Sequence, residues 1–148
     1  MSSCKTAWIT KASERSKPWG GEISWSSNAS NAVKTLTLEK GKRNSFKYNA
    51  NKDEMLICGA GKVKVYFGDE ELITKEHGDL ATDILEPGSA LIVQSSCPYR
   101  LEAIEDSIIL EVSSRIDAGP VRLHDDYGRA TITPSDFMSR IILKWFPT

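Results

Sequence analysis

The sequence is poor in the residues that build metal and disulfide sites. It has two histidines and three cysteines among 148 residues. Cys4, Cys58 and Cys97 are widely spaced and form no CxxC pair, so they are predicted to be reduced thiols, and no zinc or dithiol redox site is expected from cysteine.

Long hydrophobic runs and a strong net charge are also absent. No apolar run approaches the roughly 20 residues of a membrane span, and the N-terminus MSSCKTAWITKASERSK lacks the apolar stretch of a signal peptide. The 19 basic side chains are balanced by 20 acidic ones, so no global field attracts nucleic acid or anionic membrane. We therefore expect a cytoplasmic protein without nucleic-acid or membrane partners.

The charges are unevenly divided along the chain. Residues 1–74 carry 12 basic and 8 acidic side chains, whereas residues 75–148 carry 7 and 12. A basic half can line a site for an anionic ligand, and it can equally form a solvated face. The sequence leaves both interpretations open.

Short apolar runs separated by turn residues dominate the middle of the chain. They are AVKTLTL (32–38), MLIC (55–58), KVKVYF (62–67), ALIVQ (90–94) and SIILEV (107–112). Strand signals with Gly or Pro between them predict an all-β antiparallel sandwich or barrel and exclude a Rossmann-type nucleotide site. We expect one domain over 1–148, with a barrel core at about 30–115, an N-terminal arm at 1–30 and a C-terminal segment at 116–148.

The C-terminal segment is predicted to contain one amphipathic helix over 134–145. Thr133 stands at the expected N-cap, Pro134 at the first helical position and Asp136 two residues later. The apolar residues at helical spacing are Phe137, Ile141, Ile142 and Trp145. This stripe is expected to pack on the barrel or across a dimer contact.

Several segments together resemble one family. They are KPWG (17–20), VKTLTLEKGKRNSFKY (33–48), Glu54 before an apolar strand, EPG (86–88), PYR (98–100), ILEV (109–112) and VRLHDDYGR (121–129). Their order and spacing are similar to type II mannose-6-phosphate isomerases and to the C-terminal domain of mannose-1-phosphate guanylyltransferases. The resemblance implies a cupin (RmlC-like) double-stranded β-helix, or jelly-roll barrel.

The resemblance also implies that the usual metal site is largely replaced. Where the family places a Gln, a His, a Glu and a second His on a divalent metal, this chain has Lys47, Asn49, Glu54 and Tyr99. Amide, phenol and ammonium groups are poor or repulsive ligands for such metals. We expect no cofactor, and Zn, Mn, Fe or Ni only at low occupancy on Glu54 with Asn49 and Tyr99. Lys47 is expected to form an ion pair with Glu54 where the metal would sit.

The other candidate ligands do not repair this loss. His77 lies in the polar segment EHGD, and His124 lies outside both metal motifs. Cys97, two residues before Tyr99, is the one soft ligand expected near the same cavity, although a buried free cysteine is the commoner structure.

The family-matched residues define the candidate site. The predicted catalytic residues are Glu54 as base with Lys47 or Tyr99 as acid. The predicted ligand-binding residues are Lys17, Trp19, Lys34, Asn49, Arg100, Arg122, Tyr127 and Arg129. Arg122 and Arg129 suit phosphate oxygens, but they also suit ion pairs with Asp125, Asp126 or Glu111. Trp19 and Trp25 suit either a sugar or the barrel core.

Three hypotheses follow for function. The first is a cupin with a degenerate metal site that binds a small anionic sugar ligand, a sugar phosphate or nucleotide sugar. The second is an active sugar-phosphate isomerase of the mannose-6-phosphate to fructose-6-phosphate type. The third is a non-catalytic structural dimer module. A homodimer is expected in each case, because open sheet edges call for cover.

Overall fold

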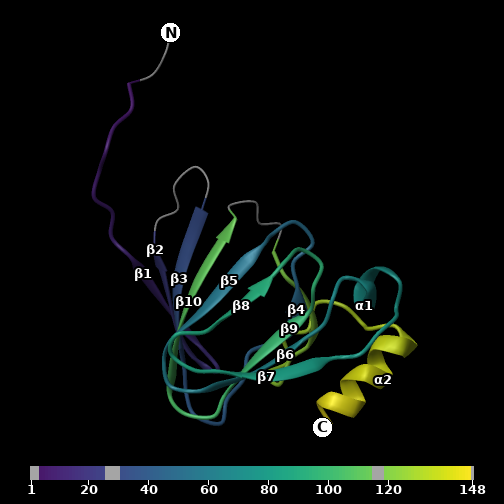
Figure 1. Ribbon diagram of the computed structural model, residues 1–148. Coiled ribbons are helices and arrows are strands. Elements are labelled where there is room, and N and C mark those ends of the chain that lie inside the picture. Colours follow the sequence, from purple (N-terminus) through teal and green to yellow (C-terminus); the bar gives the residue numbers. More distant parts are fainter. Residues whose placement is uncertain (1–3, 26–30, 115–118, 148) are drawn as a thin grey trace.

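Two antiparallel sheets face each other in the computed structural model, which describes residues 4–25, 31–114 and 119–147 (Figure 1). The six-stranded sheet has the order β1 (Ser13–Lys17), β2 (Gly20–Trp25), β3 (Asn31–Leu38), β10 (Ser107–Ser114), β5 (Glu54–Ala60) and β8 (Ala90–Val93). The five-stranded sheet has the order β11 (Val121–His124), β4 (Phe46–Tyr48), β9 (Tyr99–Ala103), β6 (Val63–Phe67) and β7 (Ala81–Leu85). The prediction of an all-β core is confirmed.

The five apolar runs of the sequence all lie in strands, namely β3, β5, β6, β8 and β10. The strands that the pattern missed are short or polar, such as β1 (SERSK) and β9 (YRLEA). The hairpin β1–β2 extends the six-stranded sheet beyond the range 30–115. Gly20 is required at its turn, because a Cβ there would lie 1.9 Å from the Thr37 carbonyl oxygen.

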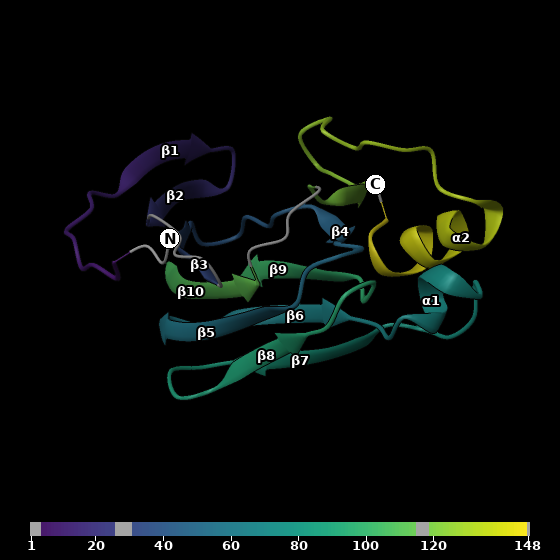
Figure 2. The ribbon, with the colours of Figure 1, turned by 90° about the horizontal axis from the view of Figure 1, so that it is seen from above.

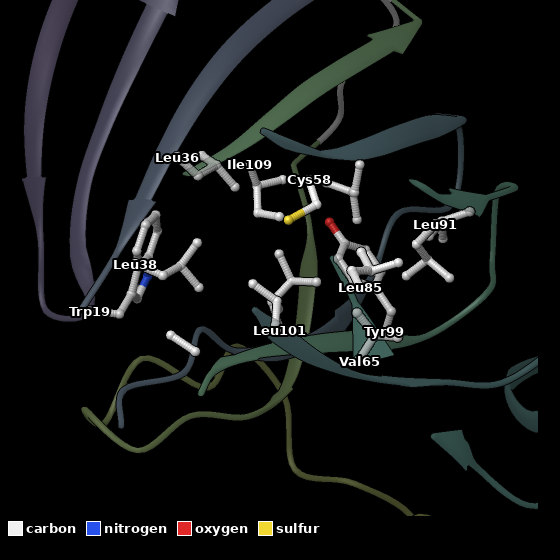
Figure 3. Close-up of a cluster of buried hydrophobic side chains, with 14 residues drawn as sticks. Trp19, Leu36, Leu38, Cys58, Val65, Leu85, Leu91, Tyr99, Leu101 and Ile109 are labelled. Carbon is white, nitrogen blue, oxygen red and sulfur yellow. The ribbon is translucent and has the colours of Figure 1, made fainter. Parts of the chain in front are cut away.

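The interior follows from the alternation of side chains along each strand. In β10, Ser107, Ile109, Glu111 and Ser113 are buried while the residues between them are more exposed. Figure 3 shows Leu36, Ile109 and Cys58 of the six-stranded sheet facing Val65, Leu101 and Tyr99 of the five-stranded sheet. One part of the interior is therefore an apolar core, and the inward positions beyond it are polar.

A second apolar cluster covers the outer face of the five-stranded sheet. Helices α1 (Glu71–Thr74) and α2 (Asp136–Trp145) lie on this side of the molecule (Figure 2). Their side chains pack with outward-facing residues of the sheet, in a cluster formed by Phe46, Tyr66, Leu72, Leu80, Leu123, Met138, Ile141, Ile142 and Phe146. The apolar stripe of the C-terminal helix thus packs on the barrel.

The helix start differs from the prediction. α2 begins at Asp136, and the N-cap is Ser135, whose hydroxyl accepts a hydrogen bond from the Met138 amide at 3.2 Å. The prediction of Thr133 as N-cap with Pro134 in the first turn was wrong. Two hydroxyl residues flank the proline, and only the one in reach of a free amide of the first turn can cap it.

Neither described helix is long and apolar enough to cross a membrane.

Candidate functional site

A polar cavity of about 200 Å³ opens between the two sheets beyond the apolar core. Seven basic residues line it: Arg15, Lys17, Lys34, Lys47, Lys52, Arg122 and Arg129. Three acidic residues line it: Glu22, Glu54 and Glu111. The cavity wall is therefore rich in positive charge, although the whole chain is nearly neutral.

Strand register explains why these residues meet. On the five-stranded sheet, Lys47 of β4 is paired with Tyr99 of β9 on one side and with Arg122 of β11 on the other. On the six-stranded sheet, Glu111 of β10 is paired with Lys34 of β3. Directly paired residues project to the same face of a sheet, so both rows face the cavity.

Glu54 is a buried carboxylate of the cavity that is hydrogen-bonded through both of its oxygens. It is 4% exposed, and its two carboxylate oxygens accept hydrogen bonds from the Asn49 amide and the Tyr99 hydroxyl, each at 2.5 Å. Figure 3 shows the Tyr99 hydroxyl pointing away from β9 toward the opposite sheet. Burial and the Glu54 carboxylate raise the pKa of Tyr99 well above its ordinary value, so the phenol is a neutral donor.

The predicted ion pair between Lys47 and Glu54 is not formed. No ion pair within 4.0 Å joins these two described residues, and the ammonium near Glu54 belongs to Lys52, at 4.0 Å. Lys47 instead lies with its ammonium 5.6 Å from the centre of the Tyr99 ring. Tyr99 and Asn49 donate to the two oxygens of Glu54 instead, and Glu54 attracts Lys47 only from beyond ion-pair distance, which raises the pKa of Lys47 against the larger effect of burial.

Glu111 is a second buried carboxyl of the cavity, at 7% exposure. Burial and the neighbouring Glu54 raise its pKa, against the opposing effect of Lys47. Burial lowers the pKa of Lys47, while Glu111 and Glu54 oppose this shift. The sequence suggested Glu111 only as an ion-pair partner of arginine. The alternation of apolar residues in SIILEVSS could have shown that Glu111 faces inward.

Two of the predicted ligand-binding lysines share one acid. Lys34 lies 2.9 Å and Lys17 3.5 Å from the Glu22 carboxylate. Although partial burial raises it, the two ammonium groups lower the pKa of Glu22 overall. Glu22 was not among the predicted site residues, because a lone glutamate in GGEISW carries no motif.

Arg129 lines the cavity but is already paired. Its guanidinium donates to Asp125 at 2.8 Å and 3.2 Å, and Ser45 also donates to Asp125 at 2.7 Å. Although burial opposes it, these bonds hold the pKa of Asp125 well below its ordinary value. Tyr127 does not line the cavity, being exposed with the Arg129 guanidinium 5.6 Å from its ring centre. The DDYGR segment thus forms an internally bonded turn.

Arg100 lies outside the cavity. It is fully buried on the opposite face of β9 from Tyr99, because successive side chains of a strand alternate. Its guanidinium donates to the Asn44 carbonyl at 2.7 Å and to Asp126 at 3.0 Å, contacts His124 at 3.0 Å, and lies 4.7 Å from the Phe146 ring centre. Its contacts are those of a structural residue beneath the C-terminal segment.

The remaining predicted residues are divided between the cavity and the surface. Trp19 and Asn49 are buried and line the cavity, whereas Trp25 is exposed and donates to Thr35 at 3.1 Å. Cys97 lies in a separate surface groove with Phe67 and Pro98. His77 is exposed, and His124 contacts Arg100.

The donor set of the cavity does not fit a divalent metal. Across the described residues, no three His, Cys, Asp or Glu side chains gather in a way that could hold one. Glu54 is hydrogen-bonded through both oxygens, and its neighbours are an amide, a neutral phenol and an ammonium. Such groups are weak or repulsive metal ligands.

Comparisons with known proteins support the fold. No protein-family model and no curated protein sequence matches the chain. KdgF from Halomonas sp. has a similar structure, with a TM-score of 0.59 and 13% identity over 73% of this chain and 90% of that one. A mutant oxalate decarboxylase from Bacillus subtilis has a TM-score of 0.65 and 17% identity, over 91% of this chain and 34% of that one. CapF, a capsular polysaccharide assembling protein from Staphylococcus aureus, has a TM-score of 0.59 and 9% identity, over 81% of this chain and 31% of that one.

These likenesses concern the fold. The chain spans about a third of the oxalate decarboxylase and CapF chains. At identities this low, the similar structures support the fold alone, and that fold is the cupin jelly roll predicted from the sequence. The finer resemblance to type II mannose-6-phosphate isomerases rests on the sequence motifs alone.

Proposed function

We propose that this protein binds a small anionic sugar, of the sugar phosphate or nucleotide sugar class, in its barrel cavity without a metal ion. The observation that carries the proposal is the excess of basic over acidic groups on the cavity wall. Hydrogen-bonding groups such as Asn49, Glu54 and Glu111 lie beside these cations. Cationic and hydroxyl-binding groups together suit a ligand that has both an anionic group and a polyol.

The buried polar groups support a binding role over a packed core. Asn49, Lys52, Glu54 and Glu111 are each less than 9% exposed. Polar burial costs free energy unless each group is paired, and an apolar core of the same volume would avoid this cost. Retained polarity around a cavity therefore favours a site that recognises a polar ligand.

The test is ligand-dependent thermal stability in the presence of a chelator. Mannose 6-phosphate at about 100 times its Kd is expected to stabilise the protein by about 2.7 kcal/mol, and EDTA should leave the shift unchanged. Differential scanning fluorimetry with a panel of sugar phosphates and nucleotide sugars measures this effect. No shift with any of them would contradict the proposal, and a shift abolished by EDTA would contradict its metal-free part.

An active isomerase is the second candidate, and the pKa shifts of the cavity favour it. Burial lowers the pKa of Lys47 and raises the pKa of Glu111. Both shifts move the pKa toward neutral pH, where a group transfers protons efficiently. Glu54 is less suited as the base, because both of its oxygens already accept hydrogen bonds. Turnover of mannose 6-phosphate to fructose 6-phosphate distinguishes this candidate from simple binding.

The homodimer stays a prediction, and the outer face of the six-stranded sheet supports it. Met55, Ile92, Ile108 and Leu110 point outward there and are 38% to 60% exposed. Light scattering at micromolar concentration is expected to report twice 16.4 kDa, because apolar faces of this kind are usually covered.

Single substitutions to lysine test whether this face, and not another surface, forms the dimer contact. Leu110→Lys is expected to give the monomer mass, whereas Ile84→Lys, on β7 of the other sheet, should leave the dimer intact. A wild-type monomer would contradict the prediction and, with it, the hypothesis of a structural dimer module.

A further inference from the structure

Lys47 and Arg122 form a cross-strand pair of like charges in the cavity wall. They are directly opposite each other on β4 and β11, and both line the cavity. Side chains in directly opposite positions have Cβ atoms about 4.5–5.5 Å apart, and like charges there are destabilising. The fold thus holds two cations side by side at a cost in stability.

Neither cation of this pair is neutralised by a direct contact. Within the part of the chain that the structure describes, no carboxylate lies within 4.0 Å of Lys47 or Arg122, and the Arg122 guanidinium makes no hydrogen bond. Glu111 and Glu54 attract Lys47 from a greater distance.

The other family-matched cations are in the opposite state. Lys17 and Lys34 share the single negative charge of Glu22, and Arg129 pairs with Asp125. Lys17, Lys34 and Arg129 therefore already have a direct carboxylate contact, whereas Arg122 has none among the described residues.

We propose that Lys47 and Arg122 form the subsite for a phosphate monoester group of the ligand, an inference that rests on the proposed function. A phosphate monoester carries close to two negative charges, which match this pair, whereas a carboxylate carries one. Arginine suits two phosphate oxygens at once, and lysine supplies a point charge beside it.

The opposite wall sets the orientation of the ligand. Glu111 of the six-stranded sheet faces the same cavity, and carboxylates repel phosphate but accept hydrogen bonds from sugar hydroxyls. The phosphate therefore lies toward β4 and β11, and the hydroxyls lie toward β10. The ligand class is a phosphorylated sugar, in preference to a neutral sugar or a sugar acid.

The test is calorimetric titration with mannose 6-phosphate, mannose and glucuronate. Arg122→Gln and Lys47→Met are each expected to weaken binding of mannose 6-phosphate by about tenfold or more, as loss of a charge-assisted hydrogen bond predicts. Arg15→Gln is the matched control, since Arg15 lines the same cavity from β1 and is exposed. It should weaken binding by about fivefold or less.

Stability without ligand provides a second readout. Arg122→Gln should leave the Tm equal to that of the wild type or raise it, because it removes a repulsion and breaks no described contact. A lowered Tm would mean that Arg122 has a structural partner, and it would overturn the subsite.

The outcomes separate this inference from the proposed function. Equal affinity of the wild type for glucuronate and mannose 6-phosphate, or an equal loss for Arg15→Gln and Arg122→Gln, would overturn the subsite while sugar binding stands. Failure of the wild type to bind any of the three sugars would overturn both.

Discussion

Replacing Glu54 with leucine is expected to lower the free energy of unfolding by about 3–5 kcal/mol. The carboxylate is buried and is the acceptor for both Tyr99 and Asn49. Leucine would leave these two donors without their acceptor in the barrel interior. Urea unfolding followed by fluorescence measures the loss.

A double-mutant cycle identifies the partner of Glu54. In the structure Tyr99 donates directly to Glu54, whereas Lys47 makes no ion pair with it. The Glu54→Leu and Tyr99→Phe substitutions should therefore be strongly non-additive, because the double variant removes donor and acceptor together. The Glu54→Leu and Lys47→Met pair should show a smaller coupling.

The control for Glu54 is Glu14→Leu, on the exposed strand β1, which should change stability by about 0.5 kcal/mol or less. A change as small as this for Glu54→Leu would show that the carboxylate does not lie in the barrel interior. A larger coupling with Lys47 than with Tyr99 would restore the ion pair that the sequence suggested.

Replacing Arg100 with methionine is expected to cost a similar amount, about 3–5 kcal/mol. The buried guanidinium satisfies the Asn44 carbonyl and Asp126 and lies against the Phe146 ring. Methionine fills much of the volume but removes the donor of the Asn44 carbonyl and leaves Asp126 with Arg43 as its remaining guanidinium partner. Lysine should not restore stability, because one ammonium cannot reproduce the planar set of donors.

The Arg100 effect should be confined to stability. Arg140→Met, on the exposed side of α2, is the control and should change stability by about 0.5 kcal/mol or less. Because Arg100 does not line the cavity, the folded Arg100→Met variant should bind sugar phosphate like the wild type. Selective loss of binding in a stable variant would place Arg100 in the site after all.

Acid should reduce the difference between wild type and Arg100→Met. Although burial opposes it, Arg43 and Arg100 hold the pKa of Asp126 below its ordinary value. A lowered carboxyl pKa contributes stability that is present above the unfolded pKa of about 3.9 and is lost as the pH falls through the folded pKa. The two unfolding curves should therefore approach each other below about pH 4.

Strand positions and inward faces could be read from the sequence because they depend on local pattern. The alternation in SIILEVSS places Ile109 and Glu111 on one face whatever the rest of the chain does. The polar and missed strands, such as β1, carry no such pattern. They are strands because neighbouring strands supply their hydrogen-bond partners.

The contents of the cavity could be predicted in part. Family-matched motifs brought Lys47, Asn49, Glu54 and Tyr99 together, and all four line the cavity. They did not distinguish Tyr99 from Arg100, although a step of one residue along a strand reverses the face of the side chain. The orientation of β9 in its sheet therefore decides that Tyr99 lines the cavity and that Arg100 packs on the other face.

Pairing between groups on different strands was decided by the tertiary structure alone. Unlike Asp125 and Arg129, which lie four residues apart in one segment, Glu22 pairs with Lys17 and Lys34, and Glu54 with Tyr99, across strands. These contacts form only where folding brings the two side chains within hydrogen-bond distance. If two charges move a few ångströms apart and water enters between them, the attraction is much weaker. Residue types and their spacing limited the site to a set of candidates. Among the described residues, the folded barrel then left Lys47, Arg122 and the exposed Arg15 as cavity cations without a direct carboxylate contact. It placed Lys47 and Arg122 directly opposite each other on neighbouring strands.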